Sequence, residues 1–120
     1  MGQIKSFQEL EVWQRAHQLV LAVYRVTKEF PPDERYGLVS QMRRAAVSVP
    51  ANIAEGFKRR GKAEKIRFYN ISEASLEELK YYLILSRDLG YIADTEQLMA
   101  DAETVSRMLY RLIASIDSRR

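Results

Sequence analysis

The sequence predicts an all-α fold, with a single domain over residues 1–120 that is built as an antiparallel up-down four-helix bundle. Three observations predict this fold. Apolar residues recur every three or four positions in four separate segments, as on the buried face of a helix. Proline or glycine separates these segments. The alternation typical of a strand is confined to residues 47–49, where Pro50 is unsuited to a central strand.

The first helix is expected to follow Ser6, because Ser6 and Glu9 have the spacing of a capping box. Its apolar face continues to Phe30, and Pro31 and Pro32 end the helix. The residues of this face are Leu10, Trp13, Ala16, His17, Val20, Val23, Tyr24 and Thr27.

The second helix is expected from Leu38 to Phe57, with Gly61 marking its end. Pro50 lies inside this pattern, where its ring would clash with the carbonyl of Ala46 and its missing N–H removes one helical hydrogen bond. We therefore expect the second helix to be kinked or interrupted near Pro50. A kink within one helix and a new helix that starts at the proline are both compatible with the sequence.

The third and fourth helices are separated by Gly90, which stands where a helix C-terminus favours a residue with positive φ. The third apolar face runs from Phe68 to Leu89. The fourth helix is expected to begin after a cap at Asp94, with Gln97 three residues on, and its apolar positions alternate by three and four.

Positive charge is concentrated in residues 40–67. This segment has eight Lys or Arg residues against two Glu, whereas the whole chain has a net charge of +3, so the rest is slightly acidic. Clustered Lys and Arg are typical of surfaces that bind nucleic-acid phosphates. A solvated helix end with a basic loop is the alternative. The candidate nucleic-acid-binding residues are Arg43, Arg44, Lys58, Arg59, Arg60, Lys62, Lys65 and Arg67.

No catalytic, metal or cofactor site is predicted. The chain has no cysteine, which excludes disulfides, thiolate metal ligands and cysteine catalysis. Its single histidine, His17, follows Gln14 rather than Glu at the spacing of a di-iron motif, so a hydrogen-bonded core or boundary histidine is expected. The sequence has no glycine-rich phosphate loop, and no nucleophile, base and orienting group converge in it. The protein is therefore expected not to be an enzyme.

Other polar residues near the basic segment are given structural or accessory roles. Asn52 and Glu55 lie one turn apart beyond Pro50 and are expected to be partly buried, with Glu55 paired to a nearby arginine. Tyr69 follows Arg67 and is the tyrosine expected on the basic side, where it could stack on a base.

Apolar residues outside the core stripes of the first and third helices predict homo-oligomerisation, with ordinary surface apolarity as the alternative. These residues are Leu19, Leu21, Val26, Ile66, Tyr69, Tyr81, Ile84 and Leu85. The N-terminus lacks the apolar region of a signal peptide, and no run approaches the roughly 20 apolar residues of a membrane span. The protein is therefore expected in the cytoplasm, without a membrane partner.

Three segments carry a resemblance to a known family: FQELEVWQRAHQLVLAVY, FPPDERYGLVSQMRRAAVSVPANIAEGFKR and FYNISEASLEELKYYLILSRDLGYI. The chain resembles the bacterial four-helix-bundle proteins encoded in intervening sequences of 23S ribosomal RNA genes, often labelled ribosomal-protein-like. By similarity to accessory proteins of diversity-generating retroelements, the resemblance implies a homopentamer with a positively charged surface that acts with a reverse transcriptase and nucleic acid. It brings no catalytic residues.

Together, these observations predict a non-enzymatic, homo-oligomeric bundle that binds nucleic acid, with RNA as the expected class, by holding phosphates on its basic surface. The alternative is a protein-interaction adaptor or scaffold without direct nucleic-acid contact. An enzyme with a small-molecule pocket between protomers has no motif in its favour.

Overall fold

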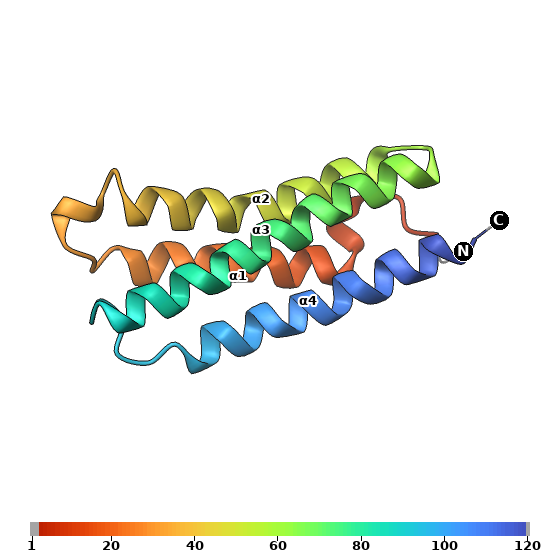
Figure 1. Cartoon of the computed structure of the whole chain (residues 1–120). Helices are drawn as coiled ribbons and strands as arrows, with labels where there is room; N and C mark the ends of the chain where they lie inside the picture. Colours follow the sequence, from red (N-terminus) through yellow and green to blue (C-terminus); the bar gives the residue numbers. More distant parts are fainter. Residues whose placement is uncertain (1–2, 120) are drawn as a thin grey trace.

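The computed structural model describes residues 3–119. Four helices lie side by side in a rod of 49 × 23 × 22 Å, and consecutive helices run antiparallel (Figure 1). No strand occurs within the described residues, which confirms the all-α up-down bundle. The elements are η1 (Phe7–Glu9), α1 (Glu11–Thr27), η2 (Pro32–Glu34), α2 (Leu38–Lys58), α3 (Lys62–Asp88) and α4 (Glu96–Asp117).

The capping box at the N-terminus is confirmed, but it caps a different element from the one predicted. Ser6 Oγ accepts a hydrogen bond from the Gln8 N–H at 3.2 Å, and Glu9 Oε2 accepts one from the Ser6 N–H at 3.1 Å. The turn that they close is the short η1, because Leu10 is extended (φ −73°, ψ 125°) and α1 begins only at Glu11. The first helix therefore starts later than the sequence predicts.

Helix α2 continues through Pro50 as one element, so the alternative of an interrupted helix is excluded. Carbonyls just before the proline receive side-chain hydrogen bonds. Asn52 Nδ2 donates to the Ser48 carbonyl at 2.9 Å, and Ser72 Oγ of α3 donates to the Val49 carbonyl at 2.8 Å. The carbonyl that loses the Pro50 N–H is that of Ala46, so these two hydrogen bonds lie beside the missing one and do not replace it. Gly61, predicted to mark the end of α2, is instead the N-cap of α3.

At the other end of the bundle, Gly90 adopts φ 82° as predicted, and the Tyr91 N–H donates to the Ser86 carbonyl at 2.9 Å. The predicted cap of α4 is wrong by one residue. Thr95 is the N-cap, and Asp94 accepts a hydrogen bond from the Glu96 N–H at 2.9 Å.

Helices α2 and α3 come very close where Gly56 faces Tyr69. A Cβ atom at position 56 would lie 2.6 Å from Tyr69 Cε1, so only glycine leaves room for the ring. Tyr69 is 2% exposed as a result. The expectation that Tyr69 lies on the basic side and stacks on a base is therefore wrong, because its ring fills the core between the two helices.

Candidate nucleic-acid interface

The eight basic residues predicted to form one surface are divided into two groups. Six of them lie in residues 58–67, which we call the basic turn, where α2 ends and α3 begins. Arg43 and Arg44 lie toward the other end of α2, and the 14 residues from Arg44 to Lys58 correspond to about 21 Å of helix. The sequence placed all eight in one segment, but the rod shape of α2 separates them.

The basic turn is strongly cationic. Residues 58–67 contain six Lys or Arg residues and one acidic residue, Glu64, for a net charge of +5. Lys58 and Arg60 are exposed, and neither side chain has a hydrogen bond or ion pair with another described residue. Their charges are therefore available to a ligand.

Phe68 gathers two arginines of the same turn. The guanidinium carbons of Arg59 and Arg67 lie 4.4 Å and 4.6 Å from the centroid of its ring. Arg59 also lies 3.7 Å from Glu55, and Arg67 Nε donates to Glu64 at 3.0 Å. The hydrogen bond from Arg67 lowers the pKa of the Glu64 carboxyl, and the charge of Arg59 lowers it further.

The two lysines of α3 in this turn are occupied by backbone carbonyls. Lys65 Nζ donates to the carbonyls of Phe57 at 2.8 Å and Gly56 at 3.2 Å at the end of α2. The Gly56 carbonyl also accepts a hydrogen bond from the Arg59 N–H at 3.2 Å. Burial lowers the pKa of Lys65, and the nearby charge of Arg119 adds to this effect. Lys62 Nζ donates to the Arg119 carbonyl at 2.8 Å. Lys65 therefore joins the two helices of the turn, and Lys62 joins the turn to the residues that follow α4.

Arg119 is a neighbour of the basic turn that was not predicted from the sequence. The signal was available in the topology. In an up-down bundle of four helices, the second turn and the C-terminus lie at the same end, as Figure 1 shows.

Arg43 is fixed at the α1–α2 contact. Its Nε donates to Thr27 Oγ1 at 3.0 Å, its Nη2 donates to the Tyr24 carbonyl at 3.3 Å, and its guanidinium carbon lies 4.4 Å from the Tyr24 ring centroid. Arg43 is half-buried. The hydrogen bonds occupy the Nε–Nη2 edge of the guanidinium, the Tyr24 ring covers one face, and Nη1 has no partner among residues 3–119.

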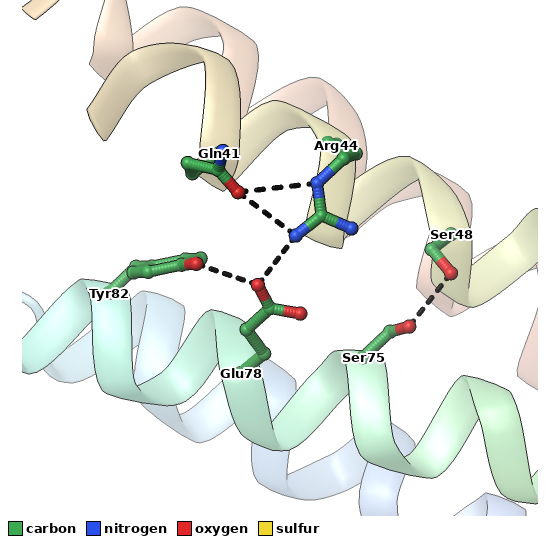
Figure 2. A network of polar contacts seen from close by, with 6 residues as sticks. All are labelled: Gln41, Arg44, Ser48, Ser75, Glu78 and Tyr82. Carbon is green, nitrogen blue, oxygen red and sulfur yellow. Dashed lines mark hydrogen bonds and ion pairs between the residues drawn. The ribbon is translucent and has the colours of Figure 1, made fainter. Parts of the chain in front are cut away.

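Arg44 belongs to a polar network between α2 and α3 (Figure 2). Its Nη2 donates to Glu78 Oε2 at 2.6 Å and to Gln41 Oε1 at 3.0 Å. The Tyr82 hydroxyl donates to the same Glu78 oxygen at 2.6 Å, and this hydrogen bond raises the pKa of Tyr82. One turn along α2, Ser48 and Ser75 share a hydrogen bond of 2.7 Å. Arg44 is thus neutralised by a carboxylate of its own chain.

The remaining polar candidates have structural surroundings. His17 is half-buried at the boundary of the core, as predicted, and stacks on Trp13 with ring centroids 5.1 Å apart, but the predicted hydrogen bond does not occur with any of residues 3–119. Asn52 is half-buried, whereas Glu55 is exposed and pairs with Arg59. Within residues 3–119, no group of three or more His, Cys, Asp or Glu side chains could hold a metal ion. Each helix of this part is too short or too polar to span a bilayer.

Comparison with known proteins gives one family and one fold. The chain is similar to a crystal structure of a protein of unknown function from the S23 ribosomal protein family of Bacteroides thetaiotaomicron. The two are 22% identical, with a TM-score of 0.79 over 85% of this chain and 97% of the other. No curated protein matches. The family model of the 23S rRNA-intervening sequence protein matches residues 8–111, and the chain therefore belongs to that family.

Proposed function

We propose that this protein binds RNA without catalysing a reaction, and that the basic turn is its phosphate-binding surface. One observation carries the proposal: a turn of net charge +5 presents Lys58 and Arg60 with no partner among the described residues. Membership of a family named for 23S ribosomal RNA supports RNA as the ligand class.

The proposed contacts are electrostatic. Lys58 and Arg60 meet phosphates as open charges, and the guanidinium groups of Arg59 and Arg67, gathered on Phe68, can each hold a phosphate by two parallel hydrogen bonds. If these four side chains each neutralise one phosphate, log affinity for a duplex falls with log salt at a slope of about −3 to −4. Contacts of this kind give affinity without sequence preference.

The other predicted site residues have different parts in this proposal. Lys62 and Lys65 add to the positive potential of the turn while their ammonium groups hold backbone carbonyls. Arg44 is paired with Glu78 and contributes to the contact between α2 and α3. Arg43 lies at the opposite end from the basic turn and takes no part in the phosphate contacts proposed for that turn.

The assembly state belongs to the same proposal. Of the eight apolar residues predicted to lie outside the core, Leu21 on α1 and Tyr81 and Ile84 on α3 are exposed. Leu19 and Tyr69 are buried in the core, so the prediction is wrong for these two. We propose that the protein is a cytoplasmic homo-oligomer. More specifically, we propose a homopentamer that has a reverse transcriptase as its partner. Light scattering of the purified protein tests the stoichiometry, and a monomer at micromolar concentration contradicts it.

The binding test is fluorescence anisotropy of a structured RNA, an RNA duplex and a DNA duplex over a salt series. The double variant Lys58→Glu/Arg60→Glu is expected to lose most affinity for all three. Arg25→Glu/Arg107→Glu has the same change in net charge on exposed parts of α1 and α4, and is the matched control. Equal binding of wild type and Lys58→Glu/Arg60→Glu at low salt overturns the proposal.

An adaptor function is the second candidate, favoured by the 71% exposed Tyr110 on α4, since exposed aromatic residues are enriched in protein interfaces. Pulldown before and after nuclease treatment separates the two candidates. An adaptor keeps its protein partner when the RNA is destroyed.

A further inference from the structure

Figure 1 shows that α1, η2 and α2 meet at the end of the bundle opposite the basic turn. A groove lies there between side chains of these elements. It consists of two adjoining depressions of about 550 and 470 Å³ that share Arg35, Val39 and Arg43. We call it the corner groove. Each depression has a volume in the range of sites for small molecules, about 300–1,000 Å³.

The described lining of the corner groove is cationic. The residues that line it include no acidic residue. The basic ones are Lys28, Arg35, Arg43 and Arg44, of which Arg44 is paired with Glu78. Glu34, on η2 beside the groove, is held by its own chain, because its carboxylate accepts hydrogen bonds from the Leu38 N–H at 3.2 Å and the Tyr91 hydroxyl at 2.9 Å. Lys28, Arg35 and Arg43 have no ion pair among residues 3–119, so their charges give the groove a positive potential that favours an anion.

Arg43 is arranged in advance for such an anion. Two hydrogen bonds and the ring of Tyr24 fix its guanidinium, and the Nη1 group is left without a partner among residues 3–119. An arginine held in this way loses little side-chain entropy when it binds a ligand.

The corner groove also presents flat and apolar surfaces. The ring of Tyr36 is 89% exposed, and the Arg35 guanidinium lies 5.9 Å from its centroid. Pro31 and Pro32 form part of the apolar wall. Open aromatic rings and guanidinium planes stack on nucleobases, whereas the nearby cations suit a phosphate. An acidic peptide would match the cations but would not use the open ring.

We infer that the corner groove binds an unpaired nucleotide, with its base stacked on Tyr36 and its phosphate held by Arg35 and Arg43. The inference rests on the proposed RNA binding and adds a second site, since Arg43 and Lys58 are separated by 15 residues of α2, or about 22 Å. The protein would then hold paired RNA at the basic turn and read an unpaired base at the corner groove.

The test is titration of the protein into 2-aminopurine riboside monophosphate, whose fluorescence is quenched when the base stacks. Wild type is expected to quench it. Tyr36→Ala is expected to weaken binding about tenfold or more, and Tyr36→Phe to retain it, because stacking needs the ring and not the hydroxyl. Tyr110→Ala removes another exposed tyrosine, outside the groove, and is the matched control.

Two further measurements make the outcomes distinct. Arg35→Ala is expected to weaken the monophosphate more than the unphosphorylated riboside. Duplex RNA binding is expected to be unchanged in Tyr36→Ala, so its loss in Lys58→Glu/Arg60→Glu reports on the basic turn alone. The inference is overturned if wild type leaves the fluorescence unchanged, if Tyr36→Ala quenches like wild type, or if a glutamate-rich peptide displaces the nucleotide more effectively than adenosine monophosphate does.

Discussion

Gly56 and Tyr69 are packed so closely that a single added methyl group at position 56 would lie 2.6 Å from Tyr69 Cε1 and 2.9 Å from Cδ1. This contact sets the approach of α2 to α3 directly beneath the basic turn. The buried Tyr69 ring cannot swing into solvent without leaving a cavity. The position of the turn therefore depends on the absence of a side chain at Gly56.

Gly56→Ala is expected to lower the free energy of unfolding by about 1–3 kcal/mol, because overpacking outweighs the better helix propensity of alanine. Chemical denaturation at a fixed protein concentration measures this loss. Gly61→Ala is the control, since nothing lies within 4 Å of a Cβ at position 61. Alanine is a poorer N-cap residue than glycine, which destabilises the fold, but it lowers the conformational entropy of the unfolded chain, which stabilises the fold. These two effects oppose each other at position 61. Equal stability of Gly56→Ala and wild type would contradict the close contact.

The hydrogen bond between Tyr82 and Glu78 is expected to make the stability of the fold depend on pH in the alkaline range. The hydrogen bond to Glu78, with desolvation adding to it, raises the pKa of Tyr82 above the ordinary value of 10.0. Because the folded pKa lies above the unfolded one, the stabilisation from the neutral phenol is present below pH 10 and is lost as the pH rises through the folded pKa. Glu78→Gln is expected to return the Tyr82 pKa toward its ordinary value.

Tyrosinate absorbance against pH, with Tyr82→Phe subtracted, measures the Tyr82 titration. Tyr110→Phe serves as the control for an exposed tyrosine. Identical difference curves for Glu78→Gln and for wild type would show that the hydrogen bond in Figure 2 has no effect on the pKa of Tyr82.

Glu64 offsets one of the positive charges of the basic turn. Its pKa is lowered chiefly by the hydrogen bond from Arg67, so the stabilisation from this pair is present above pH 4.5, the ordinary value, and is lost as the pH falls through the folded pKa. Glu64→Gln releases Arg67 and raises the charge of the turn by one. We expect about threefold tighter binding of duplex RNA at low salt, with a smaller gain at high salt.

Anisotropy with the RNA duplex measures this gain. Glu96→Gln changes the net charge equally in the first turn of α4, away from the basic turn, and is expected to have little effect. The same affinity for Glu64→Gln and Glu96→Gln would show that net charge, rather than the local release of Arg67, controls binding.

The helices could be predicted from the sequence because apolar spacing, prolines and Gly90 are local signals. Contacts between distant residues could not. The donor Ser72 lies 23 residues from Val49, and Glu78 lies 34 residues from Arg44. No local pattern shows these pairs, which is why the hydrogen bond between α3 and α2 beside the proline and the neutralisation of Arg44 emerge only from the fold.

The candidate site was predicted in composition but not in arrangement. Residues 58–67 do form one turn, whereas the rise of α2 carries Arg43 and Arg44 to the other end of the bundle. The burial of Tyr69 was missed because it depends on Gly56, which has no side chain for a pattern to detect.

In the basic turn, Lys65 is expected to have a structural role and Lys58 a role in RNA binding. Lys65→Ala removes two hydrogen bonds to the last carbonyls of α2 and is expected to lower stability by about 1 kcal/mol, since both are charge-assisted but partly exposed to solvent. Lys58→Ala removes an exposed side chain without a described partner and is expected to leave stability unchanged.

If Lys58 contacts a phosphate, the same variant reduces the salt slope by about 0.9. Denaturation and anisotropy on the two variants measure both effects. The assignment is contradicted if Lys58→Ala keeps the full salt slope and Lys65→Ala reduces it. Lys65 would then be the phosphate contact, and its ammonium group would have to leave the α2 carbonyls to reach the RNA.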